Sequence, residues 1–369
     1  MGFGSGGPQQ FVWVCGGQPL QVVDSGKYLG VQLGSASGVG HTCSLQYQKM
    51  FAAWALLRRQ FAGLGCASSV GLMLHLFQAC VPPVASYACE VWGHCRLPPA
   101  LKADRTRLVQ SYHQILRQIL GLRRTTPAAI LHAEAGLGPL EHMWWVRRVR
   151  FWNALVSLPA GSLHRAVLLD SCRDAVVRNV RNWAHGFMVG LRELGYAFTI
   201  RCDALEIVDL PRVRQLLAQP TERVWQELHV CPRTCPSGGA VLCTYRRWFA
   251  RPPWAAAKER HVAHLPIAAG ALRAFLRFRA GCHGLPNDAG RRSGVPRQQR
   301  TCAGCGGSGI CDERHLVFEC PAVQPVRDRY AGLFTGPGQT MVQFMWQQNL
   351  TGVALFVRDA LAVLLAFDH

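Results

Sequence analysis

Lysine and acidic residues are scarce in this sequence. Only four of the 40 basic residues are lysines, and the 21 Asp and Glu residues leave a formal net charge of +19. Codon usage in a GC-rich genome can replace lysine with arginine, but it does not by itself remove Asp and Glu. Because arginine pairs bidentately with phosphate, the composition predicts a polyanionic partner.

Several catalytic signatures are absent from the sequence. It has no adjacent Asp-Asp pair of the kind that supplies clustered carboxylates for two-metal nucleotidyl transfer. It has neither a phosphate-binding loop ending in Lys-Ser or Lys-Thr nor a G-x-S-x-G nucleophile elbow. Cys282 and His283 are neighbours, but the partners of a nucleophilic Cys–His pair usually meet across a fold. We therefore expect no enzymatic activity from this chain on its own, and no small-molecule substrate.

Signals for export or membrane insertion are also missing. The N-terminal stretch lacks the basic start and apolar run of a signal peptide, and Gly at position 6 does not fit N-myristoylation. Residues 70–92 are long enough to span a membrane, but polar residues and the Pro82–Pro83 pair favour a core helix ending near Cys80. The 16 cysteines are then best interpreted as intracellular thiols. We expect a protein of the nucleus or cytoplasm that is not secreted and has no membrane partner.

Apolar residues recur three or four positions apart along much of the chain, which is typical of amphipathic helices. This period predicts a mainly α-helical protein, with helices over residues 47–64, 72–80, 101–120, 141–158, 168–194, 210–228, 267–280 and 342–367. The first 35 residues instead have the pattern of three short strands, the last over 27–33. Gly16 and Gly17 suit a tight turn between the first two strands. Residues 287–300 are predicted to form an exposed basic loop.

Four potential metal ligands lie near the C-terminus, in the stretch TCAGCGGSGICDERHLVFEC. Cys302 and Cys305 form a Cys-x2-Cys pair, and His315 and Cys320 form a His-x4-Cys pair. Three thiolates and one imidazole are a donor set that Zn²⁺ binds in a closed tetrahedron, without an open position for a catalytic water. Glycines after the first pair suit a tight turn there. The sequence therefore predicts a structural zinc site.

Two other cysteine arrangements compete with this ligand set. Cys311 lies between the two pairs and could replace one ligand. Cys231 and Cys235 form a Cys-x3-Cys pair. No matched second pair follows them closely, so we interpret these two residues as thiols in a loop.

Together these segments resemble reverse transcriptases of LINE-type (non-LTR) retrotransposons of algae and plants. FRAGCHGLPNDAGRRSGVPRQQRTCAGCGG, followed by CDERHLVFECP, is similar to the tail of those enzymes, where a Cys-x2-Cys…His-x4-Cys element follows the polymerase. GQPLQVVDSGKYLGVQL, QKMFAAWALLRR and LFQACVPPVASYACEVWG are similar to the end of the palm and to the thumb. By this resemblance, Tyr28, Leu29 and Gly30 belong to a hairpin close to the primer terminus.

The resemblance implies an arrangement of successive parts, and it is thin over residues 160–242. The expected parts are a palm-end β-hairpin remnant (1–35), thumb-like helices (41–125), a helical connector (126–265), a basic segment with the CCHC zinc element (266–335) and a C-terminal helix (336–369). The zinc element and the thumb-like helices imply contacts with RNA or DNA, such as a template–primer duplex.

The family's polymerase fingers and palm, with their Asp-Asp pair, would precede residue 1. We therefore expect a non-catalytic C-terminal fragment that starts inside a longer ancestral reading frame and binds nucleic acid. Two alternatives stay open. One is an inert or protein-interaction remnant with no nucleic-acid role, and the other is a polymerase part that is active only when a palm domain completes it.

Arginines of the C-terminal part are the predicted nucleic-acid contacts. They are Arg273, Arg277 and Arg279 on the helix 267–280, then Arg291, Arg292, Arg297 and Arg300 ahead of the Cys pair. Arg273 and Arg277 are four residues apart and so share a helix face. Aromatic residues can also stack on bases. Trp144, Trp145 and Trp152, however, follow the apolar spacing of their helix, so we expect them in the core.

Overall fold

The structure is a computed structural model. It describes residues 14–15, 17–19, 23–28, 31–34, 40–63, 69–93, 99–227, 244–245, 247–249, 260–307 and 309–367. The chain divides into two compact units, each drawn from separate stretches. Unit 1 comprises Met1–Leu57, Gln78–Tyr112 and Pro139–Ala218, and unit 2 comprises Arg58–Phe77, His113–Gly138 and Gln219–His369.

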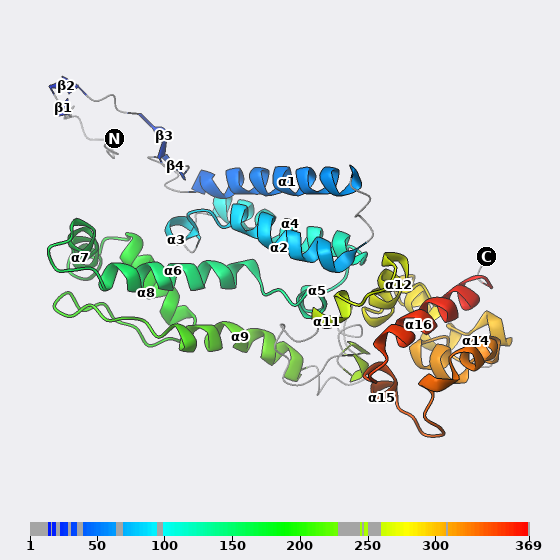
Figure 1. Cartoon of the computed structure of the whole chain (residues 1–369). Helices are drawn as coiled ribbons and strands as arrows, with labels where there is room; N and C mark the ends of the chain where they lie inside the picture. Colours follow the sequence, from blue (N-terminus) through cyan, green and yellow to red (C-terminus); the bar gives the residue numbers. More distant parts are fainter. Residues whose placement is uncertain are drawn as a thin grey trace. The chain divides into compact units, whose positions relative to one another are not determined.

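The fold is mainly α-helical, as predicted (Figure 1). The first helices are α1 (Gly40–Gly63), α2 (Val70–Ala85), α3 (Cys89–Trp92), α4 (Pro99–Leu120), α5 (Ala128–Ala135), α6 (Leu140–Val156), α7 (Leu163–Val176), α8 (Trp183–Glu193) and α9 (Leu210–Glu227). The later ones are α11 (Arg260–Ala263), α12 (Ala269–Arg279), α13 (Pro286–Arg292), α14 (Gln324–Arg329), α15 (Met341–Met345) and α16 (Leu350–Leu365). None of the helices in the described ranges is long and apolar enough to cross a membrane.

The β-structure consists of two short antiparallel hairpins near the start of the chain. Strand β1 (Val14–Cys15) pairs with β2 (Gln18–Pro19), and Gly17 at their turn has a φ of +78°. This confirms the predicted turn. Strand β3 (Ser25–Tyr28) pairs with β4 (Val31–Gly34), with Tyr28 opposite Val31. The prediction of one strand over 27–33 is therefore wrong, because the chain reverses within it.

Three predicted helices have different boundaries in the structure, and one helix was not predicted. Helix α2 continues through Pro82 and Pro83 to Ala85, and the Ser86 N–H donates to the Pro82 carbonyl at 2.9 Å, so the helical bonding resumes after the prolines. The predicted helix 168–194 is split between α7 and α8, where Asn179 adopts a φ of +53°. The predicted helix 342–367 is split between α15 and α16. The short buried helix α5 was not predicted, since glycines and prolines surround it.

The core of unit 1 is rich in aromatic side chains. Helix α3 packs against α6, and α7 packs against α8. Trp152 stacks on Phe187 with ring centroids 4.6 Å apart, and Arg148 is buried with its guanidinium 5.5 Å from the same Phe187 ring. Trp144 and Trp145 are buried as well. The three tryptophans are therefore core residues, as predicted.

Unit 2 is organised around helix α12, which packs along α16, and α5 packs against α11 (Figure 1). Towards the C-terminus, four phenylalanines form a cluster with ring centroids 5.3–6.3 Å apart. They are Phe318, Phe334, Phe344 and Phe356. Because Phe318 belongs to the His-x4-Cys segment, this cluster anchors the predicted metal-binding turn to the helices.

Candidate metal centre and arginine clusters

Cys302, Cys305, His315 and Cys320 come together in unit 2. Their ligand atoms, three Sγ and one imidazole nitrogen, lie within 4.8 Å of one another. The Cys302 and Cys320 Sγ atoms are 3.7 Å apart, and the Cys305 Sγ is 3.5 Å from His315 Nε2. A disulfide needs sulfurs about 2.05 Å apart, so no disulfide bond joins these cysteines. The predicted residues therefore form a cluster that could bind a metal ion.

The first two ligands flank a tight turn. Cys302 precedes a 3₁₀ turn over Ala303–Cys305 (η3), and the Gly307 N–H donates to the Cys302 carbonyl at 2.8 Å. Gly306 and Gly307 have φ values of +67° and +83°, which side chains with a Cβ rarely adopt. The two glycines thus allow the chain to reverse immediately after Cys305.

The other two ligands belong to one wide turn. Residues His315–Glu319 (η4) form a π-type turn, in which the Cys320 N–H donates to the His315 carbonyl at 2.8 Å. The Asp312 carboxylate accepts from the His315 N–H at 3.1 Å where the turn begins. This wider turn is often found at functional sites. Here it brings the imidazole and the Cys320 thiol together.

Polar groups support the ligands from outside. Glu319 Oε2 lies 3.6 Å from His315 Nδ1, while the other ring nitrogen, Nε2, faces the Cys305 sulfur. The half-exposed carboxylate of Glu319 can therefore orient the ring and increase its basicity, as in many metal sites. The Arg327 side chain is largely buried and donates to the carbonyl of Cys320. It places a positive charge beside this ligand.

Burial, followed by hydrogen bonds with Cys320 and Cys305, raises the pKa of the Cys302 thiol to about 11. Without a cation, this sulfur stays protonated at neutral pH, whereas a bound cation stabilises the thiolate directly. Cys311 is buried beside Cys302 but is not one of the four clustered ligands. The geometry therefore favours the ligand set of Cys302, Cys305, His315 and Cys320 over a set that contains Cys311. The rival pair at 231 and 235 lies outside the described residues.

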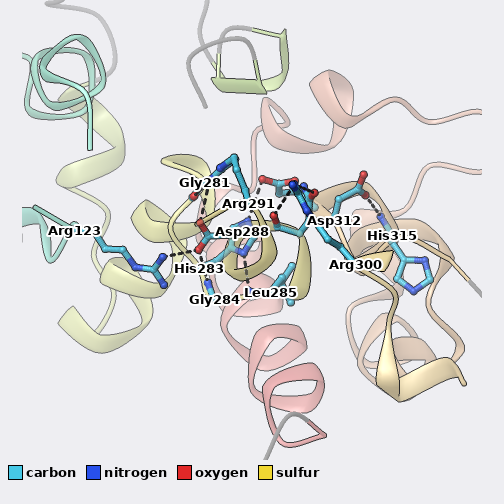
Figure 2. Close-up of polar contacts among 12 residues, drawn as sticks. Arg123, Gly281, His283, Gly284, Leu285, Asp288, Arg291, Arg300, Asp312 and His315 are labelled. Carbon is cyan, nitrogen blue, oxygen red and sulfur yellow. Dashed lines mark hydrogen bonds and ion pairs between the residues drawn. The ribbon is translucent and has the colours of Figure 1, made fainter. Parts of the chain in front are cut away.

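Asp288 binds three arginines. Its nearly inaccessible carboxylate lies 2.8 Å from Arg123 Nη1 and 3.0 Å from Arg291 Nη2 (Figure 2). The same carboxylate lies 3.7 Å from Arg292 Nε. The Gly284 N–H also donates to it at 3.1 Å. Arg291 and Arg292 lie three and four residues after Asp288 on α13, but Arg123 follows α4, 165 residues away along the chain. We call these four charged residues the Asp288 cluster.

Hydrogen bonds connect the Asp288 cluster to the metal-binding loop. The Asn287 N–H donates to the Cys311 carbonyl at 3.1 Å, and Arg300 donates to the carbonyls of Val295 and Asn287. Arg297 pairs with Asp312 at 3.0 Å. Figure 2 shows Asp288, Arg300, Asp312 and His315 in this part of unit 2. The prediction of an exposed basic loop over 287–300 is therefore wrong for residues 287–292, which belong to α13, whereas most of residues 293–299 are exposed outside any α-helix.

Arg279 is enclosed in the core of unit 2. Its side chain is fully buried and donates to Glu134 Oε1 at 2.8 Å, and Tyr245 donates to the same oxygen. The guanidinium also lies 5.1 Å from the centroid of the Trp346 ring. We call Arg279, Glu134 and Tyr245 the Arg279 cluster. A phosphate cannot reach this arginine, so its predicted nucleic-acid contact is corrected to a structural role.

Arg273 and Arg277 lie on one face of α12, as predicted. The exposed Arg277 donates from Nε to the Gly121 carbonyl at 2.7 Å. The Arg273 side chain packs on the same glycine, where a Cβ would lie 2.8 Å from Arg273 Cδ. Both arginines thus hold the turn after α4 from which Arg123 extends.

Two other predictions concern Tyr28 and the neighbours Cys282 and His283. Tyr28 ends β3, whereas residues 29 and 30 lie outside the described part of the chain.

His283 Nε2 is 3.0 Å from buried Glu313, and its Nδ1 accepts from the Leu285 N–H. Burial raises the pKa of the Cys282 thiol. Both ring nitrogens of His283 are thus engaged by Glu313 and Leu285, and neither bond involves the Cys282 thiol.

The sequence analysis did not predict the roles of Arg123, Glu134 and Asp288 in the two clusters. The spacing of Asp288 to Arg291 and Arg292 was a usable local signal, since such pairs meet on one helix face. No local pattern pointed to Arg123 or Glu134. Comparison of the chain with protein-family models, with curated proteins and with solved structures finds no match.

Proposed function

We propose that this protein is a non-catalytic nucleic-acid-binding protein whose C-terminal module is held together by a structural Zn²⁺ ion. The observation that carries the proposal is the convergence of three thiols and one imidazole on one point. Zn²⁺ bonds of about 2.3 Å to sulfur and 2.0 Å to nitrogen give tetrahedral edges of about 3.75 Å and 3.5 Å. The 3.7 Å and 3.5 Å separations match both edges.

A closed set of four protein ligands supports a structural role for the metal. Catalytic zinc sites keep a coordination position for water or substrate. Here the four donors come from two turns, each closed by its own backbone hydrogen bond, and three of the four side chains are buried. The metal would connect these turns to the helices of unit 2 and would not activate a substrate.

Charge and sequence resemblance support a nucleic acid as the partner. The chain carries a formal net charge of +19, and Arg277, Arg292 and Arg297 expose much of their side chains. The similarity of the tail and of the thumb segments to LINE-type reverse transcriptases points to RNA or DNA of the template–primer kind. Phosphate contacts of this type give affinity without requiring a catalytic centre.

Metal analysis tests the first half of the proposal. We expect about one zinc per chain after purification without added metal, and a Cys305→Ser variant should lose it. A Cys80→Ser variant is the control, because Cys80 is exposed and lies outside the metal cluster. Protein that is folded but free of zinc would contradict the proposal.

A salt titration tests the second half. The zinc-loaded chain should bind RNA, duplex DNA or both, and log Kobs should fall linearly with log salt between about 50 and 200 mM. Fluorescence anisotropy with labelled single strands and duplexes measures this slope. Binding that does not respond to salt, or no binding at all, would remove the proposed function.

A further inference from the structure

We propose that the Asp288 cluster, through Arg123, Arg291 and Arg292, is the site that binds the phosphodiester backbone of a nucleic acid. This inference rests on the proposed function and assigns it to a defined place. The cluster brings together three guanidinium groups on one carboxylate. It therefore keeps a local charge of about +2, whereas a balanced ion pair would be neutral.

The surroundings of the cluster add positive charge. Exposed Arg124 follows Arg123 in the chain, and exposed Arg277 binds the carbonyl of Gly121 two residues before Arg123. Among the described residues, Asp288 is the one carboxylate within 4 Å of a nitrogen of any of these guanidinium groups or of the three in the cluster. Asp288 is thus paired with three arginines, and two further arginines lie close to Arg123 in the chain or on its turn.

Asp288 holds the arginines in place but leaves several of their N–H donors available. A guanidinium has five N–H donors, and Arg123 uses Nη1 and Arg292 uses Nε for Asp288. The remaining N–H groups can form the bidentate pairs with phosphate oxygens that distinguish arginine from lysine. Because the side chains are already held in place, less conformational entropy is lost when a phosphate binds.

The exposure of the three side chains fits a polymer better than a small anion. The side chains of Arg123, Arg291 and Arg292 are 32%, 25% and 47% exposed, while Asp288 beneath them is 3% exposed. They form a partly exposed basic surface above a buried carboxylate. Such a surface can hold one phosphate of a backbone that continues to neighbouring arginines.

The decisive experiment compares two double variants with equal charge change. Arg123→Gln with Arg292→Gln removes two arginines of the Asp288 cluster. Arg173→Gln with Arg178→Gln removes two exposed arginines of unit 1 that each have their own aspartate. Binding of labelled RNA and duplex DNA is measured on the zinc-loaded full chain at several salt concentrations, and circular dichroism and zinc content confirm folding.

We expect the cluster variant to bind on the order of tenfold more weakly at low salt, with the log–log salt slope reduced by about one, because the cluster holds one phosphate. The unit 1 variant should keep the slope of the unchanged protein. If the cluster variant fails to fold, Arg123→Lys with Arg292→Lys replaces it. This variant should keep the slope but lose affinity, because lysine retains the charge and lacks the planar fork.

The outcomes separate the inference from the proposed function. Salt-dependent binding that survives unchanged in the cluster variant would overturn this site and leave the proposed function standing. Absence of binding by the unchanged protein would overturn both. If poly-glutamate binds through the same arginines as tightly as RNA, the site recognises an acidic protein and the inference is wrong.

Discussion

The Arg279 and Asp288 clusters of unit 2 both pair arginine with a carboxylate, but they differ in the ratio of arginines to carboxylates. In the Arg279 cluster, one guanidinium and one carboxylate are both fully buried, and Tyr245 adds a hydroxyl donor. In the Asp288 cluster, one buried carboxylate serves three partly exposed guanidinium groups. The first arrangement is neutral and closed, and the second is positively charged and open to solvent.

The difference shows why the number of arginines alone does not identify a binding surface. Both clusters contain arginines that looked equivalent in the sequence, Arg279 on α12 and Arg291 on α13. Burial with an equal number of carboxylates makes an arginine part of the core. An excess of arginine over carboxylate at the surface makes it available to a polyanion. The following experiments test this distinction.

Removal of the metal should produce the largest difference between the two clusters. The Asp288 cluster is tied to the metal-binding loop through Asn287 and Arg300, whereas the Arg279 cluster joins α12 to α5. Structural zinc contributes roughly 10 kcal/mol to folding at neutral pH. A chelator should therefore increase hydrogen exchange over residues 286–320 and abolish nucleic-acid binding, while α5 and α12 stay better protected. Equal exchange in both regions would contradict this separation.

Breaking the buried pair should have the next largest effect. An Arg279→Ala or Glu134→Ala substitution leaves an uncompensated buried charge and should lower the free energy of unfolding by about 3–5 kcal/mol. Denaturant titration measures this change in the free energy of unfolding. Arg314→Ala, which removes an exposed arginine paired with Glu319, is the control and should change stability by less than about 1 kcal/mol. The salt slope of nucleic-acid binding should stay unchanged in every variant that folds.

Removal of the shared carboxylate should have a smaller effect. Asp288→Asn retains an oxygen for the Gly284 N–H but loses the charge that gathers three arginines. We expect the free energy of unfolding to fall by about 2–3 kcal/mol, as for lost hydrogen bonds to a charged group. If stability does not change, Asp288 does not order the cluster.

Protonation of one partly buried histidine should have the smallest effect. His113 Nε2 lies 3.1 Å from His132 Nε2, and burial followed by the Arg117 charge lowers the pKa of His113 to about 4. The unfolded chain takes up this proton near pH 6.5, so stability should fall as the pH decreases from about 6.5 to about 4. Partial exposure limits the loss to about 1–2 kcal/mol.

Denaturant titrations at several pH values measure that loss. A His113→Gln variant should flatten the pH dependence in this window. The control is His164→Gln, which changes an exposed histidine of α7 in unit 1 and should leave the dependence unchanged. A curve that His113→Gln does not alter would show that other groups cause the pH dependence.

The cluster of Cys302, Cys305, His315 and Cys320, which could bind a metal ion, was predictable because its information is local. Cys302 and Cys305 are close in sequence, and so are His315 and Cys320, so each pair is placed by one turn. The long helices were predictable for the same reason, since an apolar face repeats within each of them. The turn between β3 and β4 and the split of α7 from α8 were missed, because short reversals leave little periodic signal.

The sequence by itself determined that the chain is mainly helical, that it carries an excess of arginine, and that three cysteines and a histidine can meet. Only the tertiary structure decided that Arg279 joins Glu134 in the core and that Arg123 joins Asp288 at the surface. These partners are more than 140 residues apart in the chain. Pairing over such distances depends on how helices pack, and no local spacing of residues encodes it.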